Sequence, residues 1–239
     1  MKYKLFLLSA ACLAASCITI KLDRDLLEIR TNEFETETGS HLSFENTNGD
    51  LEVREWDLNY VKVESFIYGD SSSGVPPDLN IIFEEYEDQL SAVVSYPSGI
   101  SFISVDILVM IPDHMGYTIN YTTTNGETLI IGDVTANVES TNGDIYVEVA
   151  SSHELRTING DISALLSRQS NSLTIETTNG DVTVEMPEAM GYKAETVNGD
   201  IVVDSLLMDD EVFVHENCIA GIGTTNGDIS ITRVNAHGH

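Results

Sequence analysis

"ESTNGDIYVEV", residues 139–149, places a Thr-Asn-Gly-Asp tetrapeptide between two runs in which apolar and polar residues alternate. Alternation with period two predicts a half-buried β-strand on each side, and Asn-Gly is the strongest short-range turn signal. The stretch therefore predicts strand, tight turn and strand, in the manner of a β-hairpin whose Asn and Gly both accept positive φ.

The same turn recurs along the chain. The repeated pairs are Asn48 and Gly49, Asn125 and Gly126, Asn142 and Gly143, Asn159 and Gly160, Asn179 and Gly180, Asn198 and Gly199, and Asn226 and Gly227. Successive asparagines are 77, 17, 17, 20, 19 and 28 residues apart. Two strands of about six residues cannot form a core alone, so units of nearly constant period must bury their apolar faces by stacking.

The fold predicted from this period is an all-β β-solenoid of strand-turn-strand repeats, each about 17–20 residues long. Equivalent residues of successive rungs then lie about 4.8 Å apart, so stacked Asn side chains can hydrogen-bond along the axis. A two-sheet β-sandwich or meander is the alternative, but it gives no reason to keep the same residues at every turn.

The organisation predicted for the chain follows these signals. We expect a signal peptide at 1–16, a lipidated tether at 17–33, an N-terminal β region containing the first repeat at 34–118, the repeat solenoid at 119–234 and a disordered tail at 235–239. The segment from Ser205 lengthens the last step and is expected to be an insertion or a partial cap. "IPDHMGYTINYTTTNGE" from Ile111 resembles "MPEAMGYKAETVNGD" from Met186, which favours one continuous architecture.

The N-terminus "MKYKLFLLSAACLAASC" has the features of an export signal. Lys2 and Lys4 precede an apolar run that is too short to span a bilayer as a helix, and small residues lead into Cys17. This resembles a bacterial lipoprotein signal with Cys17 as the lipidated residue. A plain secretory signal cut after Ser16 is the alternative, and Cys12 is a second, weaker lipidation candidate.

The charge balance excludes one class of partner. There are 11 Lys and Arg residues against 39 Asp and Glu, for a formal net charge of −28. Nucleic-acid phosphates are bound by clustered Lys and Arg, so we expect no nucleic-acid partner. The sequence also lacks GxSxG, HExxH and P-loop motifs, and a non-catalytic protein with no cofactor is expected.

The aspartates that follow the turns allow two interpretations. Stacking would place Asp144, Asp161, Asp181 and Asp200 in one carboxylate row, which could bind a cation such as Ca²⁺. Alternatively, each Asp accepts backbone hydrogen bonds at its turn and keeps the turn solvated. The structural interpretation is preferred, because each repeat supplies only one carboxylate.

The repeats resemble a known family. "LSFENTNGDLEVREWDLNYVKVE" (residues 42–64), the serial T-x-N-G-D-[IV] units and "VEMPEAMGYKAETVNGDI" resemble the bacterial "putative-adhesin" domain family, whose function is unknown. Glu127 and Thr128 depart from its Asp-apolar pattern. The resemblance implies an exported or membrane-attached envelope protein with no established enzyme activity, linked with surface attachment or envelope stress. Together with the N-terminal signal, it leads us to expect a non-catalytic protein, lipid-anchored at the outer membrane or cell surface, that takes part in adhesion or envelope sensing with a protein or glycan ligand. A solenoid enzyme acting on polysaccharide, a purely structural envelope component, and a secreted or periplasmic location are the alternatives.

Overall fold

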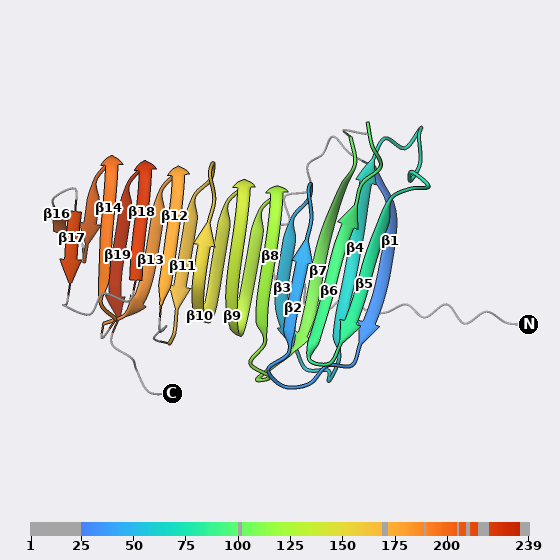
Figure 1. Ribbon diagram of the computed structural model, residues 1–239, viewed down its shortest axis with the longest axis horizontal. Coiled ribbons are helices and arrows are strands. Elements are labelled where there is room, and N and C mark those ends of the chain that lie inside the picture. The colour runs from blue at the N-terminus through green and yellow to red at the C-terminus, as the bar shows by residue number, and fades with distance from the viewer. Residues whose placement is uncertain are drawn as a thin grey trace, which may run out of the picture.

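The structure is a computed structural model that describes residues 25–99, 102–168, 172–188, 190–204, 206–208, 211–214 and 220–234. This part of the chain forms nineteen β-strands and no helix. The strands form two long layers that lie side by side (Figure 1). We call them sheet I, which contains the strands that lead into the Asn-Gly turns, and sheet II, which contains the strands that leave them. The long strands β9 and β10 bend from sheet II into sheet I.

Sheet I contains, in spatial order, β5 (Asn80–Tyr86), β6 (Gln89–Ser95), β2 (His41–Glu45), β8 (Thr118–Asn125), the second half of β9 (Thr128–Asn142), the second half of β10 (Ile145–Arg156), β12 (Leu173–Asn179), β18 (Ala220–Asn226), β14 (Tyr192–Asn198) and β17 (Glu211–Val214). Sheet II contains β1 (Asp25–Phe34), β4 (Val61–Gly69), β7 (Ser104–Pro112), β3 (Leu51–Trp56), the first halves of β9 and β10, β11 (Ile162–Leu166), β13 (Val182–Pro187), β19 (Ile229–Val234), β15 (Ile201–Val203) and β16 (Leu206–Met208).

The repeated rungs stack in parallel and in register. Ile145 of β10, for example, aligns with Thr128 on one side and with Ile162 on the other. Parallel pairing of equivalent positions is the geometry of a solenoid, whereas sandwiches and meanders are built from antiparallel neighbours. The predicted β-solenoid is therefore confirmed.

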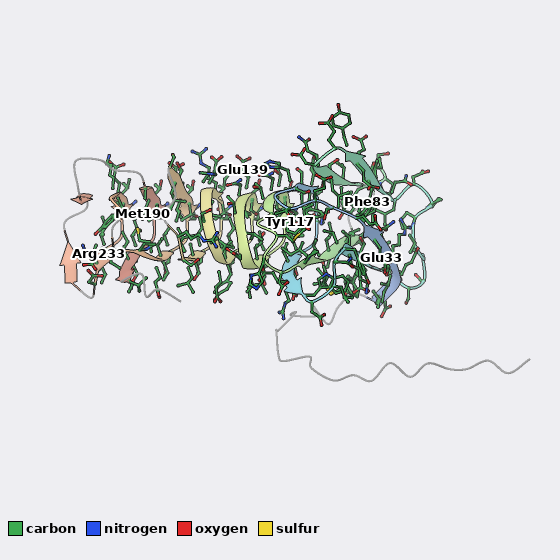
Figure 2. All side chains as sticks on the ribbon, turned by 90° about the horizontal axis from the view of Figure 1, so that it is seen from below. Glu33, Phe83, Tyr117, Glu139, Met190 and Arg233 are labelled. Carbon is green, nitrogen blue, oxygen red and sulfur yellow. The ribbon has the colours of Figure 1, made fainter. Side chains whose placement is uncertain are left out.

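The inward positions predicted by the alternation form the core. Ile145, Val147 and Val149 are at most 3% exposed, and they belong to one hydrophobic cluster that runs through the described rungs. Figure 2 shows side chains filling the space between the two layers and projecting from both outer faces. Burying one such Ile or Val contributes about 1.5–3 kcal/mol.

The prediction of a hairpin at each Asn-Gly turn is wrong. β12 before the turn pairs with β10 and β18, whereas β13 after it pairs with β11 and β19, so the two strands enter different sheets. In the described residues, positive φ at non-glycine positions occurs only at Glu87, His114 and Asp204. The asparagines therefore do not take the φ that a type I′ hairpin turn requires.

The rungs do not stack in chain order. The rung of β2 and β3 lies between those of β6–β7 and β8–β9, so Asn48 bridges directly to Asn125. The rung of β18 and β19 likewise lies between those of β12–β13 and β14–β15. At two places, therefore, the chain passes over a rung that a distant segment fills.

The repeated Pro-x-x-Met-Gly-Tyr motif marks both of these places. It connects β7 to β8 and β13 to β14, the two connections that pass over a rung. The segment of the inserted rung bonds to the motif in each case: Gly39 N–H donates to Met115 O (2.8 Å), and Ala220 N–H donates to Gly191 O (3.1 Å). Tyr117 and Tyr192 are fully buried beside these connections. The motif repeated in the sequence thus marks the two connections at which a distant segment is inserted into the stack.

Antiparallel strands close the stack at both ends. β4 pairs antiparallel with β7 and β1, and β5 pairs antiparallel with β6. At the other end, β16 and β17 pair antiparallel with β15 and β14. The segment after Ser205 was expected to be an insertion or a partial cap, and its strands lie at the end of the stack as a cap.

Two of the predicted boundaries shift. Residues 25–33, which the sequence assigns to the tether, lie in β1, because Asp25–Phe34 pairs with β4. The boundary between 118 and 119 does not separate two bodies, since the first repeat stacks directly on β8 and β9. The predicted signal peptide at 1–16 and tail at 235–239 lie outside the described residues.

Candidate binding surfaces

The turn edge carries a ladder of asparagines. Each Asn side chain after Asn48 donates from Nδ2 to Oδ1 of the Asn in the preceding rung of the stack, at 2.8–2.9 Å. In spatial order the ladder contains Asn48, Asn125, Asn142, Asn159, Asn179, Asn226 and Asn198. The predicted hydrogen bonding along the axis is confirmed, and the asparagines act as structural members of the turn.

The glycines beside them are required by the stacking distance. A Cβ built on Gly143 would lie 1.9 Å from the carbonyl oxygen of Gly126 in the next rung, and φ at Gly143 is +147°. Real Cβ atoms do not approach backbone oxygens this closely, so only glycine fits the position. The Asn-Gly pair is therefore required by the close stacking of neighbouring rungs and not by the geometry of a hairpin turn.

The aspartates form a second ladder on the same edge. Asp144 Oδ1 accepts the Asp161 N–H at 2.9 Å, and Asp161 Oδ1 accepts the Asp181 N–H at 2.8 Å. Asp228 lies between Asp181 and Asp200, and its Oδ1 accepts the Asp200 N–H at 2.9 Å. Each carboxylate thus supports the neighbouring rung, which is the role preferred above.

Cation binding by this row stays a prediction. The four aspartates named for it all lie in one row, but the inserted rung places Asp228 within it. Within the described ranges, no three His, Cys, Asp or Glu side chains converge closely enough to hold a metal ion. The geometry that the structure gives to these carboxylates is that of backbone acceptors.

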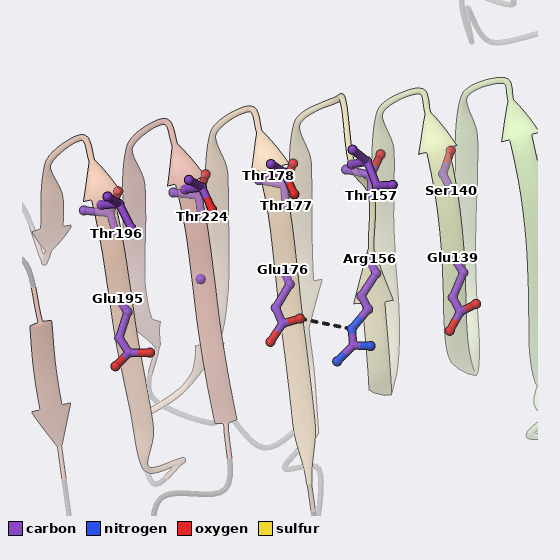
Figure 3. A pocket seen from close by; sticks show the side chains of 14 residues that line it. Glu139, Ser140, Arg156, Thr157, Glu176, Thr177, Thr178, Glu195, Thr196 and Thr224 are labelled. Carbon is purple, nitrogen blue, oxygen red and sulfur yellow. Dashed lines mark ion pairs between the residues drawn. The ribbon is translucent and has the colours of Figure 1, made fainter.

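A groove lies on the outer face of sheet I. It has a volume of about 870 Å³ and crosses the strands from β9 to β14. Figure 3 shows its lining side chains, with Glu139, Arg156, Glu176 and Glu195 along one row. We call this concavity the sheet I groove.

Gly223 forms the floor of the groove, and Gly221 lies two residues before it on the same face of β18. Gly221 and Gly223 occupy the outward positions of β18, between Thr174 and Glu176 of β12 and Lys193 and Glu195 of β14. Because β18 separates the two walls, they stand roughly 10 Å apart. "AGIGTTN" (residues 220–226) held this signal, since glycine at alternate positions of a strand marks a close approach to its backbone. This spacing is not part of the Asn-Gly repeat on which the predictions above depend.

Ion pairs line both walls of the groove. Arg156 Nε lies 3.0 Å from Glu154 and 3.2 Å from Glu176, the latter contact being drawn in Figure 3. Lys193 pairs with Glu195 on the opposite wall. The two carboxylates that face each other across the floor therefore each have a basic partner, which suits polar recognition better than acid–base chemistry.

The comparison with known families decides the identity. The family model described as Toastrack DUF4097 matches residues 103–237, or 135 of the 239 residues. The chain belongs to the Toastrack DUF4097 family. This bears out the resemblance to bacterial adhesin-like domains of unknown function. The match begins just before β7, and the repeat at Asn48, which precedes it in sequence, stacks inside the Toastrack body.

One solved structure shows the same fold at low sequence identity, and others match the chain more distantly. A "putative cell adhesion protein" from Clostridium sporogenes is 14% identical over 87% of this chain and 100% of its own, with a TM-score of 0.51. A "putative adhesin" from Bacteroides fragilis is 15% identical over 87% of this chain and 97% of its own, with a TM-score of 0.41. A "putative lipid binding protein" from Parabacteroides distasonis is 11% identical over 86% and 96%, with a TM-score of 0.23. No curated protein matches the chain.

The predicted attachment to a membrane lies in the part of the Toastrack chain that the structure does not describe. Cys17 and Cys12 both precede Asp25, the first described residue. Among the described residues there is no helix of the length and apolar character needed to cross a bilayer. Lipidation of Cys17 therefore stays a prediction.

Proposed function

We propose that this Toastrack protein is a non-catalytic binding protein of the bacterial cell envelope, and that it presents the sheet I groove to a protein or glycan ligand. The observation that carries the proposal is the groove itself, an open trough laid across five in-register strands. Rungs held by side-chain and backbone ladders form a rigid support, and a rigid surface loses little conformational entropy when it binds.

The composition and the comparisons support the same class of function. The Clostridium structure that shares this fold is named for cell adhesion, and an exported protein with a net charge of −28 is well suited to a hydrated surface. The ion-paired walls of the groove offer hydrogen-bond donors and acceptors to hydroxyl or amide groups. Adhesion or envelope sensing is thus the conclusion that we draw.

Filling the groove tests the proposal without disturbing the fold. A Cβ on Gly223 would meet its nearest atoms at 3.8 and 4.0 Å, and a Cβ on Gly221 would meet its nearest atom at 3.9 Å, both ordinary contacts. The double variant Gly221→Thr/Gly223→Thr should therefore fold normally and close the trough. The matched control is Ser230→Thr, on the sheet II side of the same rung.

The assay is capture of envelope proteins and glycans by the immobilised full-length chain. We expect the wild type and Ser230→Thr to retain the same ligands and the double glycine variant to lose them. Equal capture by all three proteins would refute the groove as the binding surface. Turnover of a bound polysaccharide that stops in Glu176→Gln would instead support the alternative of a solenoid enzyme.

The lipid anchor is tested separately. Replacing Cys17 by alanine removes the thiol that would be acylated, so Cys17→Ala should move the protein from the membrane fraction to the soluble fraction. The wild type should incorporate radiolabelled palmitate, and the variant should not. Unchanged membrane partitioning of Cys17→Ala would overturn the lipoprotein assignment.

A further inference from the structure

A second concavity lies on the outer face of sheet II, away from the sheet I groove. It has a volume of about 190 Å³. The side chains that define it are the apolar Phe66, Leu108, Leu129 and Tyr146 and the acidic Asp50, Asp106, Glu127 and Asp144. We call it the acid-rimmed cleft.

The apolar wall of this cleft departs from the repeat. Leu108, Glu52, Leu129 and Tyr146 occupy one row on β7, β3, β9 and β10, with adjacent members in register. The next three rungs place Ser163, Thr183 and Ser230 in the same row. The stack does not require a large apolar residue here, since small polar residues serve these three rungs. Tyr146 is 42% exposed.

The rim is a row of carboxylates one step nearer the turn edge. Asp50 Oδ1 accepts the Glu127 N–H at 2.7 Å, and Asp144 Oδ1 accepts the Asp161 N–H at 2.9 Å. These bonds fix the carboxylates in position without supplying a countercharge. Burial and the negative charges of Asp106 and Asp50 raise the pKa of Tyr68 beside them, as expected for a region of negative potential.

The neighbouring bases are engaged by other acids. Arg54 pairs with Glu52, which lies in the wall row of the cleft, and Lys62 pairs with Glu64 at 2.7 Å on the neighbouring strand β4. A cation brought by a ligand would therefore meet the rim carboxylates, and the net charge of −28 would steer it there.

The size of the cleft selects the kind of ligand. Sites for small molecules usually enclose about 300–1,000 Å³, so a volume of about 190 Å³ is suited to a single side chain. A lysine or arginine side chain matches the chemistry, because its aliphatic stem packs on apolar surface while its charged end stays among polar groups. Tyr146 and Phe66 add aromatic faces that attract cations.

We propose that the acid-rimmed cleft docks a lysine or arginine side chain of a partner polypeptide. The inference rests on the proposed function only in that the partner would be an envelope protein. The cleft supplies a second contact point on the opposite face from the sheet I groove. Its specificity is for a basic side chain presented by a peptide, rather than for a free amine.

The test is titration of the full-length chain with two synthetic decapeptides, one of alternating leucine and lysine and one of alternating leucine and glutamate. Isothermal calorimetry and amide chemical-shift mapping should show binding of the lysine peptide alone, with the largest shifts around Leu108, Leu129 and Tyr146. Shifts confined to the sheet I groove would overturn the proposal, and so would equal binding of both peptides.

Matched variants then separate the cleft from the ladder. Asp144→Asn and Asp181→Asn each keep the Oδ1 acceptor of the same ladder and remove one charge, but only Asp144 lines the cleft. Asp144→Asn should weaken the lysine peptide about threefold to fivefold, and Asp181→Asn should have no effect. Tyr146→Ser, which installs the residue found at position 163, should weaken it by about the same factor. Equal affinities for Asp144→Asn and Asp181→Asn would refute the site.

A titration with a free amine is the last control for the peptide experiment. Butylamine should bind at least tenfold more weakly than the lysine peptide, and equal affinity would show a small-amine site instead of a polypeptide dock. These titrations use defined peptides and do not depend on the capture of an envelope ligand. A failure of the capture assay would therefore count against the proposed function without affecting the test of the acid-rimmed cleft.

Discussion

Replacing Gly143 by alanine is the most direct test of how the rungs are held. The new Cβ would lie 1.9 Å from the carbonyl oxygen of Gly126 and 2.6 Å from its carbonyl carbon, both backbone atoms of the adjacent rung. A carbon atom approaches an oxygen no closer than about 3.3 Å. The two rungs must therefore separate locally by more than about 1 Å, or the turn must change its conformation.

The cost can be worked from the bonds that this separation breaks. Gly126 N–H donates to Asn142 O at 3.0 Å, and Asn142 Nδ2 donates to Asn125 Oδ1 at 2.9 Å, so both bonds would be stretched beyond bonding distance. Each contributes about 1 kcal/mol. Holding alanine at a φ of +147° adds about 1–3 kcal/mol. We expect Gly143→Ala to lower the free energy of unfolding by about 4 kcal/mol.

The assay is urea denaturation followed by far-ultraviolet circular dichroism, with thermal melts in parallel. Since about 1 kcal/mol moves the Tm of a chain of this size by about 2–4 °C, the expected fall in Tm is about 10 °C. The control is Gly74→Ala, in the loop after β4, where φ is +65° but no atom lies within 4 Å of the new Cβ. It should cost only about 1–2 kcal/mol, the price of the left-handed conformation.

The comparison of the two variants decides the matter. A positive φ is common to both glycines, whereas the close approach of a neighbouring backbone occurs only at Gly143. If Gly143→Ala costs no more than Gly74→Ala, the explanation of the Asn-Gly repeat by stacking is wrong.

Three further expectations concern the Asn ladder, one ion pair and the aspartate row. Asn159→Ala removes two side-chain bonds of the Asn ladder and Asn48→Ala removes one, so by chemical denaturation the first should cost about 1–2 kcal/mol and about twice as much as the second. Hydrogen bonds from Arg233 lower the pKa of Asp204 below its ordinary value, so the stabilisation is present above that ordinary value and is lost as the pH falls through the lowered pKa. Acid titration should therefore destabilise the wild type more than Asp204→Asn, and equal acid sensitivity would contradict this. Calcium should leave the Tm unchanged within about 1 °C, whereas a rise of about 10 °C would show that the aspartate row binds it.

Much of the local structure follows from the sequence pattern. The alternation around residues 139–149 correctly placed Ile145 and Val147 in the core, because period two assigns every second side chain of a strand to one face. The ladder at Asn142 was predictable for a related reason, since equal rungs bring equal residues together.

The candidate surfaces were predicted less well. Gly223 forms the floor of the sheet I groove with Gly221 beside it, and their alternate spacing indicates a close approach to the backbone without showing which strands form the walls. Leu129 and Tyr146 form part of the acid-rimmed cleft, yet a single exposed apolar residue on a strand is ordinary. A surface depends on which rungs are neighbours, and the period alone does not contain that information.

The sequence by itself determined the rung, namely its length, its inward side chains and the Asn-Gly-Asp turn that every copy shares. Only the tertiary structure decided the order of the rungs, with Asn48 beside Asn125 and Asn226 between Asn179 and Asn198. The physical reason is that the rungs are nearly alike. Any two of them can form the same parallel hydrogen bonds and the same ladder contacts, so local energies do not distinguish one stacking order from another. The stacking order is therefore selected by features that differ between the copies. These are the buried Tyr117 and Tyr192 at the two connections that pass over a rung, and the antiparallel strands that close the ends of the stack.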